Sequence, residues 1–545
     1  MMRLACVVFL LLVTGTAHAQ HGHTPSTATA PAPALTGVGG IRHPVSTRNA
    51  EAQRYFDQGL NLSFAFNHDE AFRAFQRASQ LDPQLAMATW GMALVLGPNI
   101  NLPIDEPRSK QAYELVQKAV KQAAKAPESE KAYVQALAKR YAADPKADRA
   151  KLDVAYKEAM GELSRRYPDD LDAATLYAEA AMDLRPWQYW MPDGKPNEGT
   201  VEIVEVLQSV LRRNPDHIGA NHLLIHAVEA SPHPELALGA ARRLEGAAPG
   251  AGHLVHMPTH IYARVGDHEA SAKLNEQAAE VDRDYITKHK VEGIYPAMYF
   301  NHNMHFAAYS NAARGNYKGA LRSATDVYDH ASPAVKEMPM LELFTPTPLL
   351  VQVRFRRWED VLKVSDPGET MPITRGVWRF GRGMAYAAKG DAARAAEERR
   401  ALETQIGALP AEAMVGFNPG KSILGIAAAL LDARIAESAK QDAKALEALN
   451  RAVAAEDQLA YDEPPDWYLH ARESLGGFLL RSGKPVEAEK AFRADLDRNF
   501  RNGRSLFGLA QSLRAQGKTW ASASVDQEFQ RVWKDADVKL TVDDL

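Results

Sequence analysis

Cysteine is nearly absent from this sequence: of 545 residues only Cys6 is one, and it lies close to the amino terminus. The chain therefore has no second thiol with which to close a disulfide, and beyond Cys6 it offers neither a thiol nucleophile nor a thiolate metal ligand. An excess of either charge is also lacking, since 64 basic and 68 acidic residues give a net charge of −4. This balance excludes the cationic surface that nucleic-acid binding requires.

Long hydrophobic runs are confined to the first residues. Arg3 precedes an apolar stretch over residues 4–13, and Ala17-His18-Ala19 places small residues where signal peptidase cleaves. Residues 1–19 thus predict a signal peptide and a periplasmic or secreted product without a membrane span. Residues 20–49, rich in His, Pro, Thr and Ala, lack hydrophobic periodicity and predict a disordered tail.

Beyond residue 50 the sequence is helical in pattern and self-similar. Gly59 is followed by Ala71, Phe75, Ala78 and Pro83 at offsets of 12, 16, 19 and 24 residues. The same spacing recurs at other places in the chain, for example at Gly383, Gly390 and Ala395 and at Gly476, Gly483, Ala488 and Phe492. This spacing resembles the tetratricopeptide repeat, a 34-residue pair of antiparallel helices with small residues where the helices cross.

The resemblance implies an all-α protein, an α-solenoid of about twelve helical hairpins over residues 50–535, followed by a tail over 536–545. Stacked hairpins of this family form a right-handed superhelix, and its concave groove is the usual surface for a peptide or protein partner. Two insertions, at residues 98–108 and 185–197, fall between the two helices of their repeats and should project from the same edge. The second is rich in aromatic residues, which favours either a lid over the groove or a plug between repeats.

Histidine is concentrated in one region, because eleven of the 18 histidines lie between His217 and His305. The family register places six of them on groove-facing positions of the first helices of three consecutive repeats. They form pairs three or four residues apart, a spacing that puts both rings on one helix face: His222 and His226, His256 and His260, His302 and His305. We expect these pairs to converge on a transition metal ion, zinc or copper, both of which imidazole suits.

Other residues extend this prediction. Glu179 and Asp183, four residues apart in the preceding repeat, are candidates for carboxylate ligands, and His253 lies one turn before His256 and is a further candidate. Three alternatives stay open at this point: a peptide-binding or protein-binding scaffold without metal, a metal-dependent enzyme such as a copper oxidase or zinc hydrolase, and a histidine network that only satisfies Asn221, Asn301, Asn303 and Glu229. The sequence contains no serine nucleophile elbow and no complete zinc-protease motif.

Overall fold

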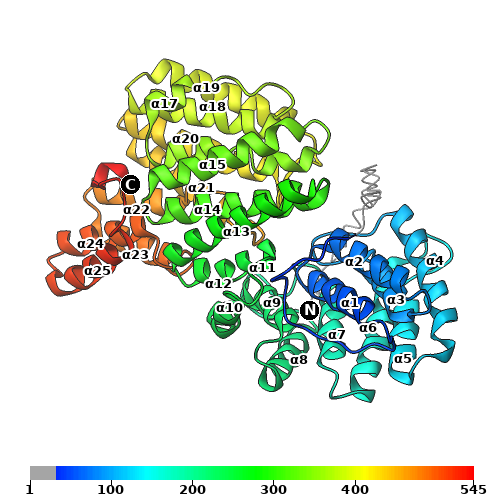
Figure 1. The fold of residues 1–545 in the computed structure, drawn as a ribbon. Coiled ribbons are helices and arrows are strands. Elements are labelled where there is room, and N and C mark those ends of the chain that lie inside the picture. Colours follow the sequence, from blue (N-terminus) through cyan, green and yellow to red (C-terminus); the bar gives the residue numbers. More distant parts are fainter. Residues whose placement is uncertain (1–31) are drawn as a thin grey trace, which may run out of the picture.

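The computed structural model describes residues 32–545 (Figure 1). The predicted signal peptide and residues 20–31 of the predicted tail lie outside the described residues. Within residues 32–545, no helix has the length and apolar character needed to cross a membrane.

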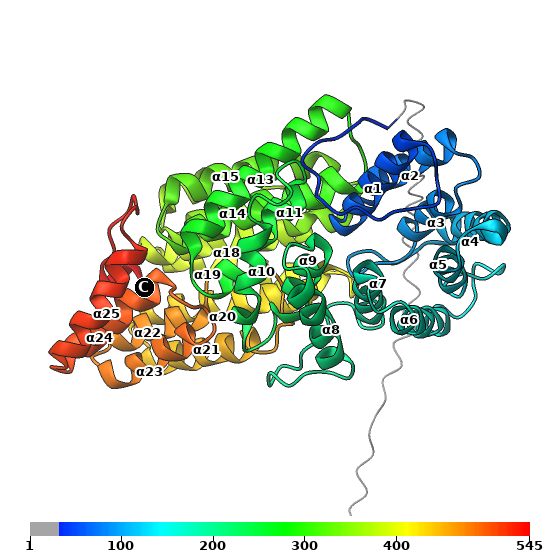
Figure 2. The same ribbon diagram turned by 60° about the horizontal axis from the view of Figure 1, so that its bottom comes forward.

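The described chain is an all-α solenoid of twelve helical hairpins, as the repeat spacing predicts (Figures 1 and 2). The first six hairpins are formed by α1 (Ala50–Phe64) and α2 (His68–Leu81), α3 (Ala86–Val95) and α4 (Glu106–Gln122), α5 (Glu128–Ala138) and α6 (Arg149–Arg166), α7 (Leu171–Met182) and α8 (Thr200–Arg213), α9 (Ile218–Val228) and α10 (Leu238–Leu244), and the consecutive α11 (Gly252–His256) and α12 (Pro258–Arg264) with α13 (His268–His289).

The other six hairpins follow without a break in the helical pattern. They are formed by α14 (Asn301–Ala313) and α15 (Tyr317–Ala331), α16 (Thr347–Arg354) and α17 (Trp358–Lys363), α18 (Pro372–Ala388) and α19 (Ala392–Ala408), α20 (Gly420–Ser438) and α21 (Asp442–Glu456), α22 (Ala471–Arg481) and α23 (Pro485–Leu496), and α24 (Gly503–Ala515) and α25 (Thr519–Val532). A short hairpin of β1 (Met414–Val415) and β2 (Asn418–Pro419) precedes α20, and a π-helical turn (Tyr295–Phe300) leads into α14.

The signature residues of the repeat act at the helix crossings. A Cβ atom added to Gly59 of α1 would lie 2.7 Å from the ring of Phe75 in α2, and one added to Gly91 of α3 would lie 2.5 Å from the same ring. In the same way, a Cβ atom added to Gly476 or to Gly508 would lie within 2.7 Å of the ring of Phe492. A large buried ring therefore requires glycine on both neighbouring helices, which explains the spacing by close packing.

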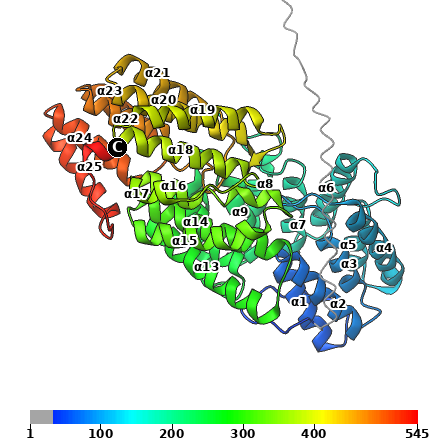
Figure 3. The same ribbon diagram turned by 90° about the horizontal axis from the view of Figure 1, so that it is seen from above.

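The superhelix closes on itself in its first half. Helix α1 of the first hairpin packs against α9 of the fifth, and the two helices are neighbours in Figure 2. Helix α9 is buried along its whole length as a result. One hydrophobic core covers residues from Ala32 to Tyr262 and a second covers residues from Ala308 onward, so α9, α11, α12 and α14 lie where the two cores meet. In Figure 3, α9 and α14 lie between the first hairpins and the C-terminal ones. We expected an open concave groove at the histidine repeats, and the structure shows a largely closed interior instead.

Residues 32–49 correct the prediction of a disordered tail, because they pack along the first hairpins as an extended strap. Gly250 donates its backbone N–H to the carbonyl oxygen of Gly37 at 2.8 Å. His43 contacts a carboxylate oxygen of Asp172 at 2.8 Å, and His217 of α9 contacts the other oxygen at 3.1 Å. Composition indicated disorder here because the segment has no hydrophobic periodicity of its own and is held by side chains of other segments, such as Gln58 and Asn61 of α1 and the distant Asp172.

Candidate metal centre

Four helices at the junction of the two cores carry the predicted histidines. Helix α9 supplies His222 and His226, α11 supplies His256, α12 supplies His260, and α14 supplies His302 and His305. The first four are buried, with exposed fractions between 0 and 2%, and His305 is 4% exposed. Such rings need partners for their nitrogens, because an unpaired polar group in the interior is unfavourable. Those partners decide what the rings can bind.

The first histidine set consists of His222, His226 and His253, whose nearest ring nitrogens lie within 4.8 Å of one another. The Nδ1 atom of His222 lies 2.6 Å from the carbonyl oxygen of Phe64, so Nδ1 carries the proton and Nε2 carries the lone pair. That Nε2 lies 3.2 Å from Nε2 of His253. His226 Nε2 is buried without a hydrogen-bond partner.

The second histidine set consists of His256, His260 and His302, also with nitrogens within 4.8 Å of one another. The Nδ1 atom of His256 donates to Oδ1 of Asn275 at 2.6 Å, and the Asn275 amide donates to the carbonyl oxygen of Ser271, which fixes its orientation. The Nε2 atoms of His256 and His260 are only 2.6 Å apart. Two lone pairs at this distance repel, so the contact requires a proton between the nitrogens or a cation in its place.

Glu229, fully buried at the end of α9, joins the two sets. One carboxylate oxygen accepts the Nδ1 proton of His226 at 2.7 Å, and the other contacts Nδ1 of His260. Glu463, from the loop between α21 and α22, lies against the same His260 nitrogen. A carboxylate on Nδ1 orients the ring and leaves Nε2 free to coordinate a metal, the arrangement usual around histidine metal ligands.

Burial and mutual repulsion set the protonation of the rings. Burial first, and neighbouring imidazoles second, hold the pKa well below the ordinary 6.5 at His222, His226, His253, His256 and His302. These five rings are therefore neutral at pH 7, the form that binds metals.

His260 is the exception within the two sets. Burial lowers its pKa, but the charges of Glu229 and Glu463 outweigh burial and raise it to about 10. Burial and the nearby Glu229 raise the pKa of Glu463 to about 8. The metal-free site thus holds one imidazolium beside the carboxyl groups of Glu229 and Glu463.

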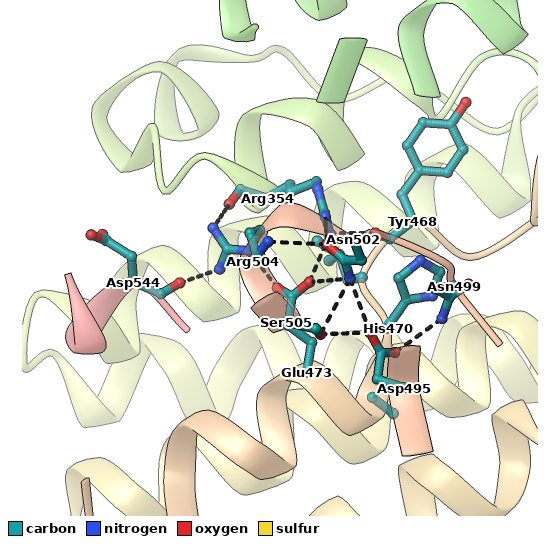
Figure 4. A network of polar contacts seen from close by, with 12 residues as sticks. Arg354, Tyr468, His470, Glu473, Asp495, Asn499, Asn502, Arg504, Ser505 and Asp544 are labelled. Carbon is teal, nitrogen blue, oxygen red and sulfur yellow. Dashed lines mark hydrogen bonds and ion pairs between the residues drawn. The ribbon is translucent and has the colours of Figure 1, made fainter. Parts of the chain in front are cut away.

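The loop that carries Glu463 is held by a buried polar network (Figure 4). Arg354 of α16 donates to the carbonyl oxygen of Tyr468 at 2.9 Å and pairs with Glu473 of α22. Burial disfavours the Glu473 carboxylate, but Arg354 and Arg504 outweigh it and lower its pKa to about 2. On the other side of Glu463, Ala460 donates its backbone N–H to the side-chain oxygen of Asn418 at 2.8 Å. The loop is therefore fixed on both sides of Glu463.

Both insertions reach the histidine sets, and the aromatic one lies against them. The ring of Trp187 contacts that of His226 edge-on, with centroids 5.2 Å apart, and the indole of Trp190 donates to the carbonyl oxygen of Ala227. Residues 99–102 of the other insertion line the cavity next to the same site. The sequence left a lid over the groove and a plug between repeats open for the second insertion, and its tryptophans lie against α9 beside His226.

Three predicted ligands lie elsewhere. His305 stacks on Tyr468, with ring centroids 5.5 Å apart, and is not a member of either set. Asp183 pairs with Arg140 at 2.6 Å, and burial together with the Asp183 charge raises the pKa of the neighbouring Glu179 to about 8. The structure therefore brings together His222, His226, His256, His260 and His302, adds His253, and leaves His305, Glu179 and Asp183 outside.

Comparison with known proteins finds solved structures with low identity and low TM-scores, and it says nothing about chemistry. Similar solved structures include a human IFIT1 dimer with PPP-AAAA (14% identity, 90% of this chain and 92% of that chain covered, TM-score 0.33). Another is yeast Tom70, with 12% identity, 88% of this chain and 99% of that chain covered, and a TM-score of 0.34. A third is the APC/C hetero-tetramer Cut9–Hcn1, with 12% identity, 89% of this chain and 76% of that chain covered, and a TM-score of 0.33. No family model matches the sequence, and no curated protein matches it. The fold is that of tetratricopeptide-like helical solenoids, and the function must be inferred from the site.

Proposed function

We propose that this protein binds two transition metal ions, zinc or copper, one in each histidine set. The observation that carries the proposal is the 2.6 Å contact between the Nε2 atoms of His256 and His260, whose Nδ1 atoms both face acceptors. A metal ion between the two nitrogens would take the place of the proton that the metal-free contact requires. The orphaned Nε2 of His226 supports an ion in the first set.

The distances suit these metals. With metal–nitrogen bonds of about 2.0–2.1 Å, two nitrogens of a tetrahedral site lie roughly 3.3 Å apart. His222 Nε2 and His253 Nε2 are already 3.2 Å apart. His256 and His260 have to separate by under about 1 Å, a side-chain adjustment. Three nitrogens per ion, with no thiolate among the described residues, favour zinc or copper over metals that prefer oxygen ligands.

Charge supports the same conclusion. Glu229 and Glu463 place two buried carboxyl groups around one imidazolium, His260. Buried charge is costly unless it is paired, and each divalent ion would add two positive charges beside these carboxyl groups and favour their ionised form. Metal binding would also displace the proton from His260 Nε2. The site should therefore be more stable with metal than without it.

The test is metal stoichiometry and affinity in protein purified without a histidine tag. Elemental analysis should find two ions per chain, and His222→Gln and His256→Gln should each lose one. The matched control is His233→Gln, whose side chain is 66% exposed and outside both sets, and which should keep both ions. A chelator should lower the melting temperature of the wild type.

A scaffold without metal is the competing function that the fold supports, since tetratricopeptide-like solenoids suit peptide and protein binding. It predicts no bound metal, and identical melting temperatures with and without chelator. Either set retaining its ion after the loss of its own histidine would also contradict the proposed coordination.

A further inference from the structure

A cavity of about 320 Å³ lies beside the two histidine sets. His226 and His253 of the first set and His260 and His302 of the second form part of its wall. Any molecule in the cavity would therefore face both proposed ions. Three protein nitrogens per ion leave a coordination position for an outside ligand, as in catalytic rather than structural zinc sites.

The rest of the wall is mainly apolar and aromatic. It is built by segments far apart in the sequence, namely the two insertions, the π-helical turn before α14, the 339–343 turn and the β1–β2 hairpin. The aromatic side chains that these segments and the α1–α2 connection contribute are those of Phe66, Trp187, Tyr295, Tyr299, Phe344 and Phe417. Ligand sites of small molecules are commonly cavities of this size with apolar walls and a few polar groups.

The mouth of the cavity keeps apolar side chains in contact with solvent. Met340, Met414 and Phe417 are 46, 43 and 43% exposed, and all three line it. Apolar side chains gathered at a hollow indicate a binding surface more than a chance exposure. Trp187, which contacts the His226 ring, also packs against Phe417, with centroids 5.5 Å apart, so the aromatic wall runs from the histidines to the mouth.

A second polar feature lies on this wall. His68 has both ring nitrogens buried without a hydrogen-bond partner. Burial first, and the charges of Arg108 and Arg140 second, lower its pKa to about 3, so the ring is neutral. An unpaired neutral imidazole can accept or donate one hydrogen bond to a ligand.

We propose that this cavity binds a small aromatic molecule with one metal-binding polar group, the ring lying against the aromatic wall formed by Trp187 and Phe417 and the polar group facing the histidine sets. The part of this inference that concerns the ligand's polar group rests on the proposed metal function. The part that concerns the ligand's aromatic ring rests on the aromatic wall of the cavity alone. The ring is the specificity element, because open metal positions alone bind any small donor.

Two hydroxamic acids test the proposal on metal-loaded, untagged protein. Benzohydroxamic acid and acetohydroxamic acid carry the same chelating group and differ in a phenyl ring against a methyl group. Calorimetric titration should give an affinity for the benzo compound higher by about 30-fold, the effect of burying one aromatic ring. Equal affinities would overturn the inference and leave metal binding standing.

Matched variants locate the ring. Phe417→Ala should lower the affinity for benzohydroxamic acid by about 10-fold and leave acetohydroxamic acid within about twofold. Phe500→Ala, which removes a 51% exposed phenylalanine outside the cavity, should change neither affinity. Equal loss for both compounds in Phe417→Ala, with the metal content intact, would contradict the placement of the ring. A wild type that binds no metal would overturn the proposed function itself, and elemental analysis reports that separately.

Discussion

Replacing Glu229 by glutamine tests whether one residue serves both histidine sets. The carboxylate accepts the Nδ1 proton of His226 through one oxygen and faces Nδ1 of His260 through the other. Glutamine has nearly the same shape but one uncharged acceptor oxygen, so the Nδ1–H groups of His226 and His260 compete for it. Both rings are then held less firmly toward their ions.

The expected loss differs between the two ions. Removing an outer-shell partner of a histidine ligand typically costs 10- to 100-fold in metal affinity, or about 1.4–2.8 kcal/mol. His260 keeps Glu463 on its Nδ1, whereas His226 has no second acceptor there. Glu229→Gln should therefore weaken the first-set ion by about 100-fold and the second-set ion by about 10-fold.

Competition with a chelator of known affinity at fixed pH measures both constants. The matched variant is Asn275→Leu, which removes the acceptor of His256 alone and should weaken only the second-set ion. Unfolding by urea should show whether the metal-free variants remain folded. Unchanged affinities in Glu229→Gln, or the same single-site loss in both variants, would refute the role assigned to Glu229.

Three further predictions concern residues outside the two sets. His305→Ala should keep both ions and lose about 2–3 kcal/mol of unfolding free energy, because it removes a buried ring stacked on Tyr468. Elemental analysis measures the metal content and urea unfolding measures the stability. Loss of an ion would contradict the placement of His305 outside both metal sites. Burial raises the pKa of Asp172, but hydrogen bonds from His217 and His43 outweigh burial and lower this pKa to about 2. The Asp172 carboxylate therefore contributes about 2 kcal/mol to the free energy of unfolding above pH 4, and this contribution is lost as the pH falls toward 2. Asp172→Asn should flatten the acid side of the stability profile between pH 2 and pH 6. Burial raises the pKa of Glu342 to about 7, although its carboxyl group accepts two backbone N–H groups at the start of α18. The protein therefore loses about 3 kcal/mol of unfolding free energy through this group as the pH rises from about 4.5 through 7. Glu342→Gln should remove that loss, and equal slopes of unfolding free energy against pH in variant and wild type between pH 5 and pH 9 would contradict it.

The helical hairpins were predictable because their sequence constraint is local. Phe75 occupies the space of two side chains, and Gly59 and Gly91 mark that requirement at fixed spacing. The pairs His222 and His226 and His256 and His260 share a face for the same kind of reason: four residues turn a helix by 400°, so their directions differ by about 40°. Helix geometry alone was enough to place these four.

The errors have physical causes that no local pattern reports. His302 and His305 are three residues apart and point about 60° from each other, so on a helix buried on all sides one faces the site and the other faces Tyr468. Asp183 is neutralised by Arg140, whose position depends on the stacking of neighbouring hairpins. Glu463 comes from a loop about 200 residues beyond the histidines, and only the tertiary packing of the second half of the chain brings it to His260.

Anomalous diffraction from crystals of the metal-loaded, untagged protein tests the central claim most directly. Data collected on either side of the absorption edge of the added metal should give two peaks per chain, one among His222, His226 and His253 and one among His256, His260 and His302. The absence of anomalous density at these six rings, or peaks only at surface histidines such as His233, would contradict the account.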